Sequence, residues 1–160
     1  MTRVQFFEGQ LLTASDLEAE QTYQMEKRRL HNRMLHGVGV VDGLAVSVED
    51  LPSAAAIVSP GLALDCYGNE IIVEAPIRVD LGICPRDTCF VTIQYTEFVT
   101  DPVLTTDGDV AFSRVTEGFT VAIMTEDPCE SAKTQRLGLA RLIRGNGHWI
   151  VDETYGRRIL

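Results

Sequence analysis

The side chains of this 160-residue chain best suited to metal or redox chemistry are its histidines and cysteines. His31 and His36 stand five residues apart in a segment that predicts a helix. On a regular α-helix that spacing places two side chains about 140° apart around the axis, so the rings should not chelate one metal ion. Hydrogen bonding at the helix end, or a packed interface, is the role we expect for this pair.

The four cysteines include no Cys-x-x-Cys motif. Cys84 and Cys89 are the one close pair, but their spacing is loose for a zinc knuckle, which would also need two distant ligands. A disulfide between them remains open, although reduced thiols are the ordinary state in the cytosol. We expect plain thiols at these positions and at Cys66 and Cys129, with no cofactor.

Motifs that carry catalysis are missing from the sequence. It contains no Gly-x-Ser-x-Gly, phosphate-binding loop, His-Glu-x-x-His or dinucleotide-binding glycine motif. Asp107-Gly108-Asp109 suggests a calcium loop, but the rest of the EF-hand pattern is absent. Because catalysis needs a nucleophile or an acid–base pair within reach, the sequence predicts a protein that is not an enzyme.

A cluster of polar side chains lies at the end of the predicted helix. Such side chains can satisfy the last helical carbonyls and the edge of the following strand. We predict that His31 or Asn32 is buried and bonded to backbone, and that Arg29 or Arg33 pairs with an acidic residue. The cluster consists of Arg29, His31, Asn32, Arg33 and His36.

The helix that carries this cluster is predicted over about 15–36. Ser15 with Glu18, or Thr13 with Asp16, forms a capping box at its start. Acidic residues load its first turns and basic residues its last turns, and both favour the helix dipole.

A thin apolar stripe follows one side of the helix, which predicts that this side packs on a sheet or a neighbouring subunit. The stripe includes Leu17, Tyr23, Leu30 and Met34, through which we expect the helix to lie against the β part. Gly37 ends the helix, and Gly37 or Gly43 should have a positive φ.

After Gly37 the hydrophobic period changes from 3.6 to 2, and short strands recur with turn signals between them. The chain therefore predicts an α+β, mainly β fold, with an N-terminal strand and the helix packed on an antiparallel sandwich or barrel-like domain. We expect a single domain over 1–160, with the strand and helix in 1–36 and the β part in 37–160. Single strands are expected at 4–7, 54–58, 77–81 and 90–98. Paired strands are expected at 38–48 around Asp42-Gly43, at 62–64 and 71–73 around Tyr67-Gly68-Asn69, at 113–115 and 119–124, and at 137–143 and 149–151. A polar loop is expected at 100–109 and another loop at 127–134.

Charge is distributed unevenly along the chain. Residues 37–132 hold three basic and sixteen acidic side chains, a net charge of −13, whereas 133–160 hold six basic and two acidic, a net charge of +4. The acidic middle argues against nucleic-acid binding, which needs a basic footprint. No apolar run approaches the roughly 18–20 residues of a membrane span, and the first residues lack a secretory signal. We expect a cytoplasmic protein without direct membrane insertion.

Residues 6–46 carry a dense series of motifs: an aromatic pair, GQLLT, Asp-Leu, Glu-Gln, KRRLHNR, LHG, GVV and a Gly-Leu pair. In this order they resemble a family of small baseplate or tail-associated proteins of phage-tail-like contractile injection systems. The stretches 59–65 and 68–71 are similar to that family as well, and 139–158 resembles the closing hairpin of such modules.

The resemblance implies a structural component at the baseplate or a fibre attachment point, assembled into a particle with other subunits. Such subunits work as repeated copies, in which one copy packs against its neighbour. We therefore expect a homo-oligomer, and a trimer by analogy with tail appendages. Phe6, Phe7, Tyr23 and Trp149 join the helix-end cluster as candidate interface residues. For Phe6, Tyr23 and Trp149, a place in the core is the expected role.

Two other functions stay open. A β-sandwich can bind carbohydrate or another cell-surface ligand through its end loops, although loops 100–112 and 127–134 contain just one aromatic residue. A metal-dependent enzyme would have to combine Asp65 with His31 or His36.

Overall fold

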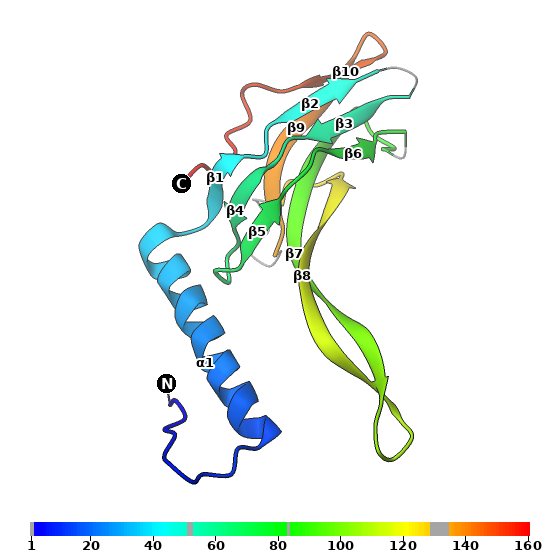
Figure 1. Ribbon diagram of the computed structural model, residues 1–160. Helices are drawn as coiled ribbons and strands as arrows, with labels where there is room; N and C mark the ends of the chain where they lie inside the picture. The colour runs from blue at the N-terminus through cyan, green and yellow to red at the C-terminus, as the bar shows by residue number, and fades with distance from the viewer. Residues whose placement is uncertain (1, 51–52, 83, 129–134) are drawn as a thin grey trace.

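The computed structural model describes residues 2–50, 53–82, 84–128 and 135–160, and Figure 1 shows a long helix beside a set of antiparallel sheets. The fold is α+β and mainly β, as the sequence predicts. Its elements are α1 (Ala14–His31), the π-helical turn η1 (Asn32–His36), β1 (Gly39–Gly43), β2 (Val46–Glu49), β3 (Ala55–Val58), β4 (Gly61–Leu64), β5 (Glu70–Val73), β6 (Ile77–Asp80), β7 (Thr88–Leu104), β8 (Val110–Met124), β9 (Leu137–Gly145) and β10 (His148–Val151).

Three sheets make up the β part in the described residues. Their strand orders are β1-β4-β5, β2-β3-β6 and β10-β9-β7-β8. Each strand of the first sheet is joined along the chain to a strand of the second (β1 to β2, β3 to β4, β5 to β6), so three long, bent strands form both sheets. The third sheet curls against them (Figure 1).

The bends of these strands correct one prediction. Asp42-Gly43 does not close a hairpin, because β1 pairs with β4 and β2 pairs with β3. Gly43 and Leu44 instead turn a corner with φ of 62° and 50°. Gly43 lies opposite Gly61, where an added Cβ would come 2.1 Å from the Pro60 carbonyl oxygen. The predicted positive φ is confirmed at Gly43, and at Gly37 with φ 88°.

Two predicted hairpins are confirmed. β4 pairs with β5 around the turn at Gly68, and β9 pairs with β10 across Asn146-Gly147. The expected strands 54–58 and 77–81 appear as β3 and β6, which pair with each other. These elements are set by local turn residues and alternating hydrophobicity.

The region after residue 98 differs from the prediction. The expected polar loop 100–109 is mostly strand, since β7 runs on to Leu104 and β8 begins at Val110. The segments 113–115 and 119–124 are not paired with each other, because both belong to β8. A continuous ladder from Phe90–Met124 to Leu104–Val110 holds this long ribbon together. The expected loop 127–134 lies mostly outside the described residues.

The core lies between the sheets. Its fully buried members include Leu44, Ile71, Leu81, Ile93 and Leu142. Trp149 from β10 is buried with them, so its predicted place in the core is confirmed.

The N-terminal region departs from the prediction in its packing. Residues 4–7 form no strand, because the segment closes on itself: Phe7 N donates to Gln10 Oε1 at 3.2 Å, and Gln10 N donates to the Phe7 carbonyl at 3.2 Å. The ring of Phe6 is 49% exposed rather than part of the core. Tyr23 is half-buried beside Thr2, where the segment returns along α1.

The helix begins and ends where the sequence places its caps. Thr13 is the N-cap and forms the capping box with Asp16, which is the second of the two predicted registers. The hydrogen bond from the Thr13 hydroxyl lowers the pKa of Asp16. The last turn, before Gly37, is a π turn rather than regular α-helix.

The predicted contact between the helix stripe and the sheets is not found along the whole stripe. Leu17 is 53% exposed and Met34 is 74% exposed, whereas Tyr23 and Leu30 are partly buried, and no residue of α1 is fully buried. In Figure 1 the helix extends away from the sheets instead of lying across them. None of the described helices is long and apolar enough to cross a membrane.

Candidate interaction site

The end of the helix is anchored to the turn between β4 and β5. Asn32 is buried, and its side-chain amide donates to the Gly68 carbonyl at 2.9 Å and to Glu70 Oε1 at 3.1 Å. Gly68 has φ 84°, and an added Cβ would lie 2.2 Å from the carbonyl oxygen of Arg29. The turn and the helix therefore touch backbone to backbone, which only glycine allows.

Asp65 holds this turn in shape. It is buried, and its Oδ1 accepts from the backbone N–H groups of Tyr67 and Asn69, both at 2.8 Å. Its Oδ2 accepts from the Asn69 side-chain amide at 2.8 Å. Asp65 thus makes structural bonds and positions Gly68 for the helix.

Two arginines tie the helix to the third sheet. Arg29 pairs with Glu97 of β7 at 3.0 Å, and Arg28 reaches Glu117 of β8 at 3.4 Å. The Tyr95 hydroxyl donates to the same Glu97 oxygen at 2.9 Å, and burial raises the pKa of Tyr95. The predicted burial of Asn32 and the predicted pairing of Arg29 are both confirmed, and we call this set of contacts the helix anchor.

The two histidines lie together, contrary to the prediction. The π turn η1 follows an i to i+5 register, with Gly37 N donating to the Asn32 carbonyl at 2.9 Å. It therefore brings His31 and His36 to the same side, with their Nε2 atoms 3.2 Å apart. The 140° separation applies to a regular helix, and the π turn removes it. Both rings and Arg33 are exposed.

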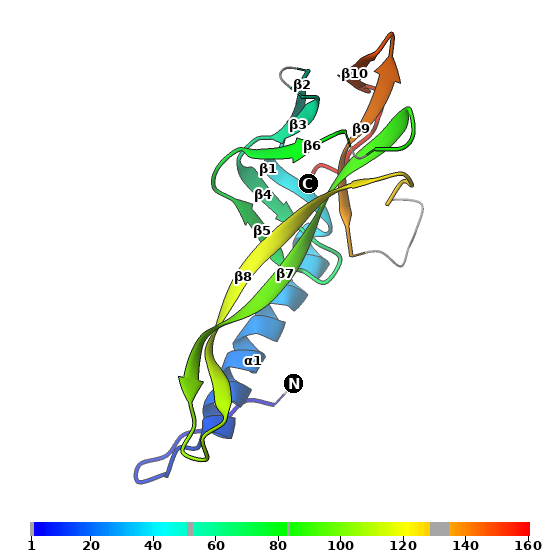
Figure 2. The same cartoon turned by 90° about the vertical axis from the view of Figure 1, so that its right-hand side faces the viewer.

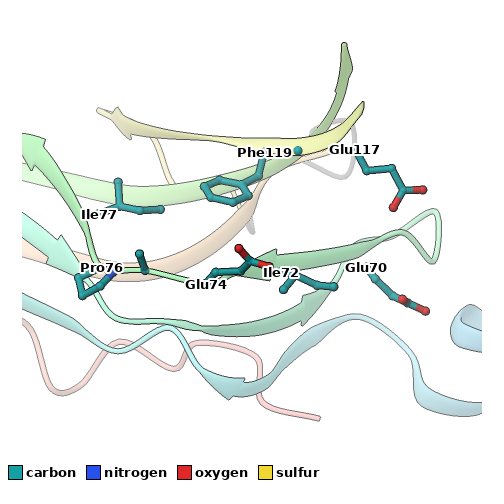
Figure 3. Close-up of a pocket in the computed structure, with 9 residues that line it drawn as sticks. Glu70, Ile72, Glu74, Pro76, Ile77, Glu117 and Phe119 are labelled. Atoms are coloured by element: carbon teal, nitrogen blue, oxygen red, sulfur yellow. The ribbon is translucent and has the colours of Figure 1, made fainter. Parts of the chain in front are cut away.

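An open pocket of about 550 Å³ lies between β5 and β8 (Figure 3). Both strands are edges of their sheets. Ile72, Ile77 and Phe119 supply its apolar lining, and Glu70 and Glu117 of the helix anchor lie toward one end. The pocket has an apolar floor and an acidic rim, with carboxylates that are already engaged by Arg28.

Two projections extend from the same end of the β body, as both views show (Figures 1 and 2). The helical arm comprises residues 2–31. The ribbon arm comprises residues 98–116, the outer part of β7 and β8. The β body is the remainder of the three sheets.

The ribbon arm exposes large apolar side chains on a two-stranded element. Val99 and Val115 lie opposite each other in the ladder, and both are exposed. The Phe98 ring lies across Gly118, where an added Cβ would come 3.1 Å from the ring. The exposed set comprises Phe98, Val99, Val103, Leu104, Val110, Phe112 and Val115.

The helical arm shows a similar property at its far end. Its exposed large apolar side chains are Phe6, Phe7, Leu11, Leu12 and Leu17. Most of the exposed large apolar side chains of the described residues lie on the two arms, although Val41, Ile72 and Ile150 are exposed on the β body. Large exposed apolar patches are typical of interaction sites.

Metal and redox chemistry have few groups available. Among the described residues no three His, Cys, Asp or Glu side chains lie together as a metal site. Cys66, Cys84 and Cys89 are free thiols, and Cys129 lies outside the described residues. Burial raises the pKa of the Cys89 thiol to about 12, and a hydrogen bond with Cys84 adds to the shift. A thiol with that pKa is a poor nucleophile or metal ligand.

Sequence reasoning missed several members of the site. Glu70, Glu97 and Glu117 carried no local signal that pairs them with the helix, since their partners lie 38 or more residues away. The sequence predicted Gly68 as a turn residue, but not as the residue whose backbone contacts the helix. Among the exposed ribbon residues, Val103 and Leu104 fell in the predicted loop 100–109, because polar and turn-forming residues surround them, whereas Phe98 and Val115 fell in predicted strands.

Comparison with known proteins identifies the fold. No known protein family and no curated protein match the sequence. A chain of the type VI secretion system TssK-TssF-TssG baseplate subcomplex matches with a TM-score of 0.66 and 15% identity, over 98% of this chain and 62% of that one. A chain of the baseplate complex from the type VI secretion system matches with a TM-score of 0.60 and 15% identity, over 98% of this chain and 59% of that one.

TssK from EAEC, in complex with a nanobody, matches with a TM-score of 0.56 and 16% identity, over 88% of this chain and 54% of that one. This chain therefore spans less than two thirds of each of these neighbours. At such identities the similarity concerns the fold: the chain shares its architecture with baseplate components of a secretion system.

Proposed function

We propose that this chain is a non-catalytic assembly subunit of a phage-tail-like contractile injection particle, acting in the baseplate or as a fibre-attachment adaptor. Its fold matches baseplate chains over 98% of its length. The motifs of 6–46, which resemble those of small tail-associated proteins, support the same role.

The single observation that carries the proposal is the pair of apolar arms. A stable monomer has no use for Val99, Leu104 and Phe112 on the outside of a ribbon, since each exposed apolar side chain forgoes about 25 cal/mol per Å² of burial. Surfaces of this kind become useful when another subunit covers them. The arms therefore act as the contact surfaces, and the β body acts as their support.

A second copy of the same chain is the partner that we propose for the ribbon arm. Closed symmetry lets one surface recur on every subunit, and a trimer is the expected state.

The solution mass tests this assembly. Light scattering of the purified chain should give three times the 17.7 kDa of a monomer. The double variant V99S/V115S should lower the mass to that of one chain while the far-ultraviolet circular dichroism stays unchanged. Ile150→Ser is the matched control, because Ile150 is as exposed as these valines but lies on the β body. A mass of one chain at every concentration would overturn the homo-oligomer.

Placement in the particle is tested separately. Antibody labelling of purified particles in electron micrographs should mark the baseplate end, and particles from cells that lack the gene should have no complete baseplate. Normal particles without this chain would refute the assembly role, whatever its oligomeric state.

A further inference from the structure

We propose that His31 and His36 form a two-histidine site for a divalent transition-metal ion, with Zn²⁺ as the representative ion. Nothing in the assembly role above requires this site. It arises from the π turn that joins the helix to the β body, and the argument rests on the geometry of the two rings.

The distance between the ring nitrogens fits coordination of one ion. The Nε2 atoms are 3.2 Å apart, and the ring centroids are 5.1 Å apart at an angle of 57°. Zinc binds imidazole nitrogen at roughly 2.0–2.1 Å in tetrahedral geometry, which separates two ligand nitrogens by about 3.3 Å. Each ring would offer its Nε2 lone pair and keep its proton on Nδ1. Imidazole is also a preferred ligand of copper and nickel.

The backbone presets this geometry. The hydrogen bond from Gly37 N to the Asn32 carbonyl defines the i to i+5 turn, and the side chain of Asn32 fastens the same turn to Gly68. Insertions of this kind are frequent at functional sites. Because the turn is held from inside the molecule, the rings do not have to be brought together when the ion binds, which lowers the entropic cost of binding.

Both rings are accessible. Of the cations that flank them in the sequence, Arg28 and Arg29 are engaged by glutamates of the helix anchor, whereas Arg33 lies in the same turn and is exposed. Among the described residues no third His, Cys, Asp or Glu joins the pair, so water completes the coordination sphere. Two imidazoles make this a site of moderate affinity.

A hydrogen bond between neutral rings would give the same distance, so the test must separate the two interpretations. In the full chain, histidine ring resonances are followed by nuclear magnetic resonance while ZnCl₂ is added. Those of His31 and His36 should shift together and saturate at one ion per chain. Those of His148, which lies elsewhere and pairs with Asp50, serve as the internal control and should not move.

Variants measure the contribution of each ring by calorimetry. His31→Gln and His36→Gln should each weaken Zn²⁺ binding at least tenfold, and His148→Gln should leave it unchanged. Both rings are exposed, so the variants should keep the melting temperature of the parent. Equal shifts at all three histidines, or unchanged affinity in the two single variants, would overturn the site.

Discussion

Leu142 and Leu104 lie on neighbouring strands of one sheet, yet Leu142 is fully buried and Leu104 is 77% exposed. The first belongs to the β body and the second to the ribbon arm. Apolar side chains of the body pack against one another, because the three sheets enclose a common core. The arms have partners in the described chain only at their base, through the helix anchor. The difference indicates that stability resides in the body, and it supports the proposed role of the arms as contact surfaces.

The helix anchor connects the two regions. It combines a backbone contact at Gly68, the buried amide of Asn32, and ion pairs of Arg28 and Arg29. These contacts fix the direction of the helical arm without burying its apolar stripe. A subunit that assembles by symmetry needs this rigid direction more than it needs a buried helix.

The largest expected effect separates body from arm. Leu142→Ala should lower the free energy of unfolding by about 2–5 kcal/mol, because it leaves a cavity in the core. Leu104→Ala should change it by less than about 0.5 kcal/mol in dilute protein. Urea denaturation of both variants measures the difference, and equal losses would show that the ribbon tip is packed in the isolated chain.

A smaller effect is expected where the arm joins the body. Gly68→Ala places a Cβ against the Arg29 carbonyl and should cost more than Gly108→Ala. Both glycines have φ near 85°, but Gly108 has open space around it. The backbone strain alone is about 1–2 kcal/mol, so a greater loss at Gly68, seen in thermal melts, measures the contact with the helix. Identical melting temperatures would mean that the helix is not seated on the turn.

Removing the buried amide should follow in size. Asn32→Ala leaves the Gly68 carbonyl without its donor, which typically costs about 1–3 kcal/mol. Arg33→Ala, one residue away and exposed, is the control. Chemical denaturation should distinguish the two variants. If Asn32→Ala left the free energy of unfolding unchanged, the ion pairs of Arg28 and Arg29 would be what holds the helix.

The ion pairs should contribute least. Arg29 and Glu97 are partly exposed, so their coupling in a double-mutant cycle should be about 0.2–1 kcal/mol and should shrink as salt is added. The charge swap R29E/E97R should recover part of the loss caused by either single reversal. A coupling that does not respond to salt would contradict the surface character of the pair.

Local signals predicted what local forces build. The capping box at Thr13, the hairpins at Gly68 and Asn146-Gly147, and the burial of Asn32 all follow from neighbouring residues. Asp42-Gly43 was predicted to close a hairpin, and that prediction is wrong because β1 and β2 pair with other strands. The strand corner forms because Gly43 pairs with Gly61 of β4, which is distant in the sequence.

Three features could not be read from neighbouring residues. The strand through 100–104 is sustained by its ladder with β8 rather than by its own sequence. The glutamates of the helix anchor lie near the helix because the folded sheet brings their strands there. The π turn contains Asn32, whose side chain is hydrogen-bonded to Gly68 in a distant turn. The contact between His31 and His36 therefore depends on tertiary structure.

The central claim, that a second copy covers the ribbon arm while the β body stays uncovered, is tested most directly by hydrogen–deuterium exchange at two protein concentrations. We predict that amides of the ribbon arm exchange more slowly in concentrated protein, while those of β9 and the other body strands exchange at the same rate at both concentrations. Exchange rates in the ribbon arm that do not depend on concentration would contradict the claim.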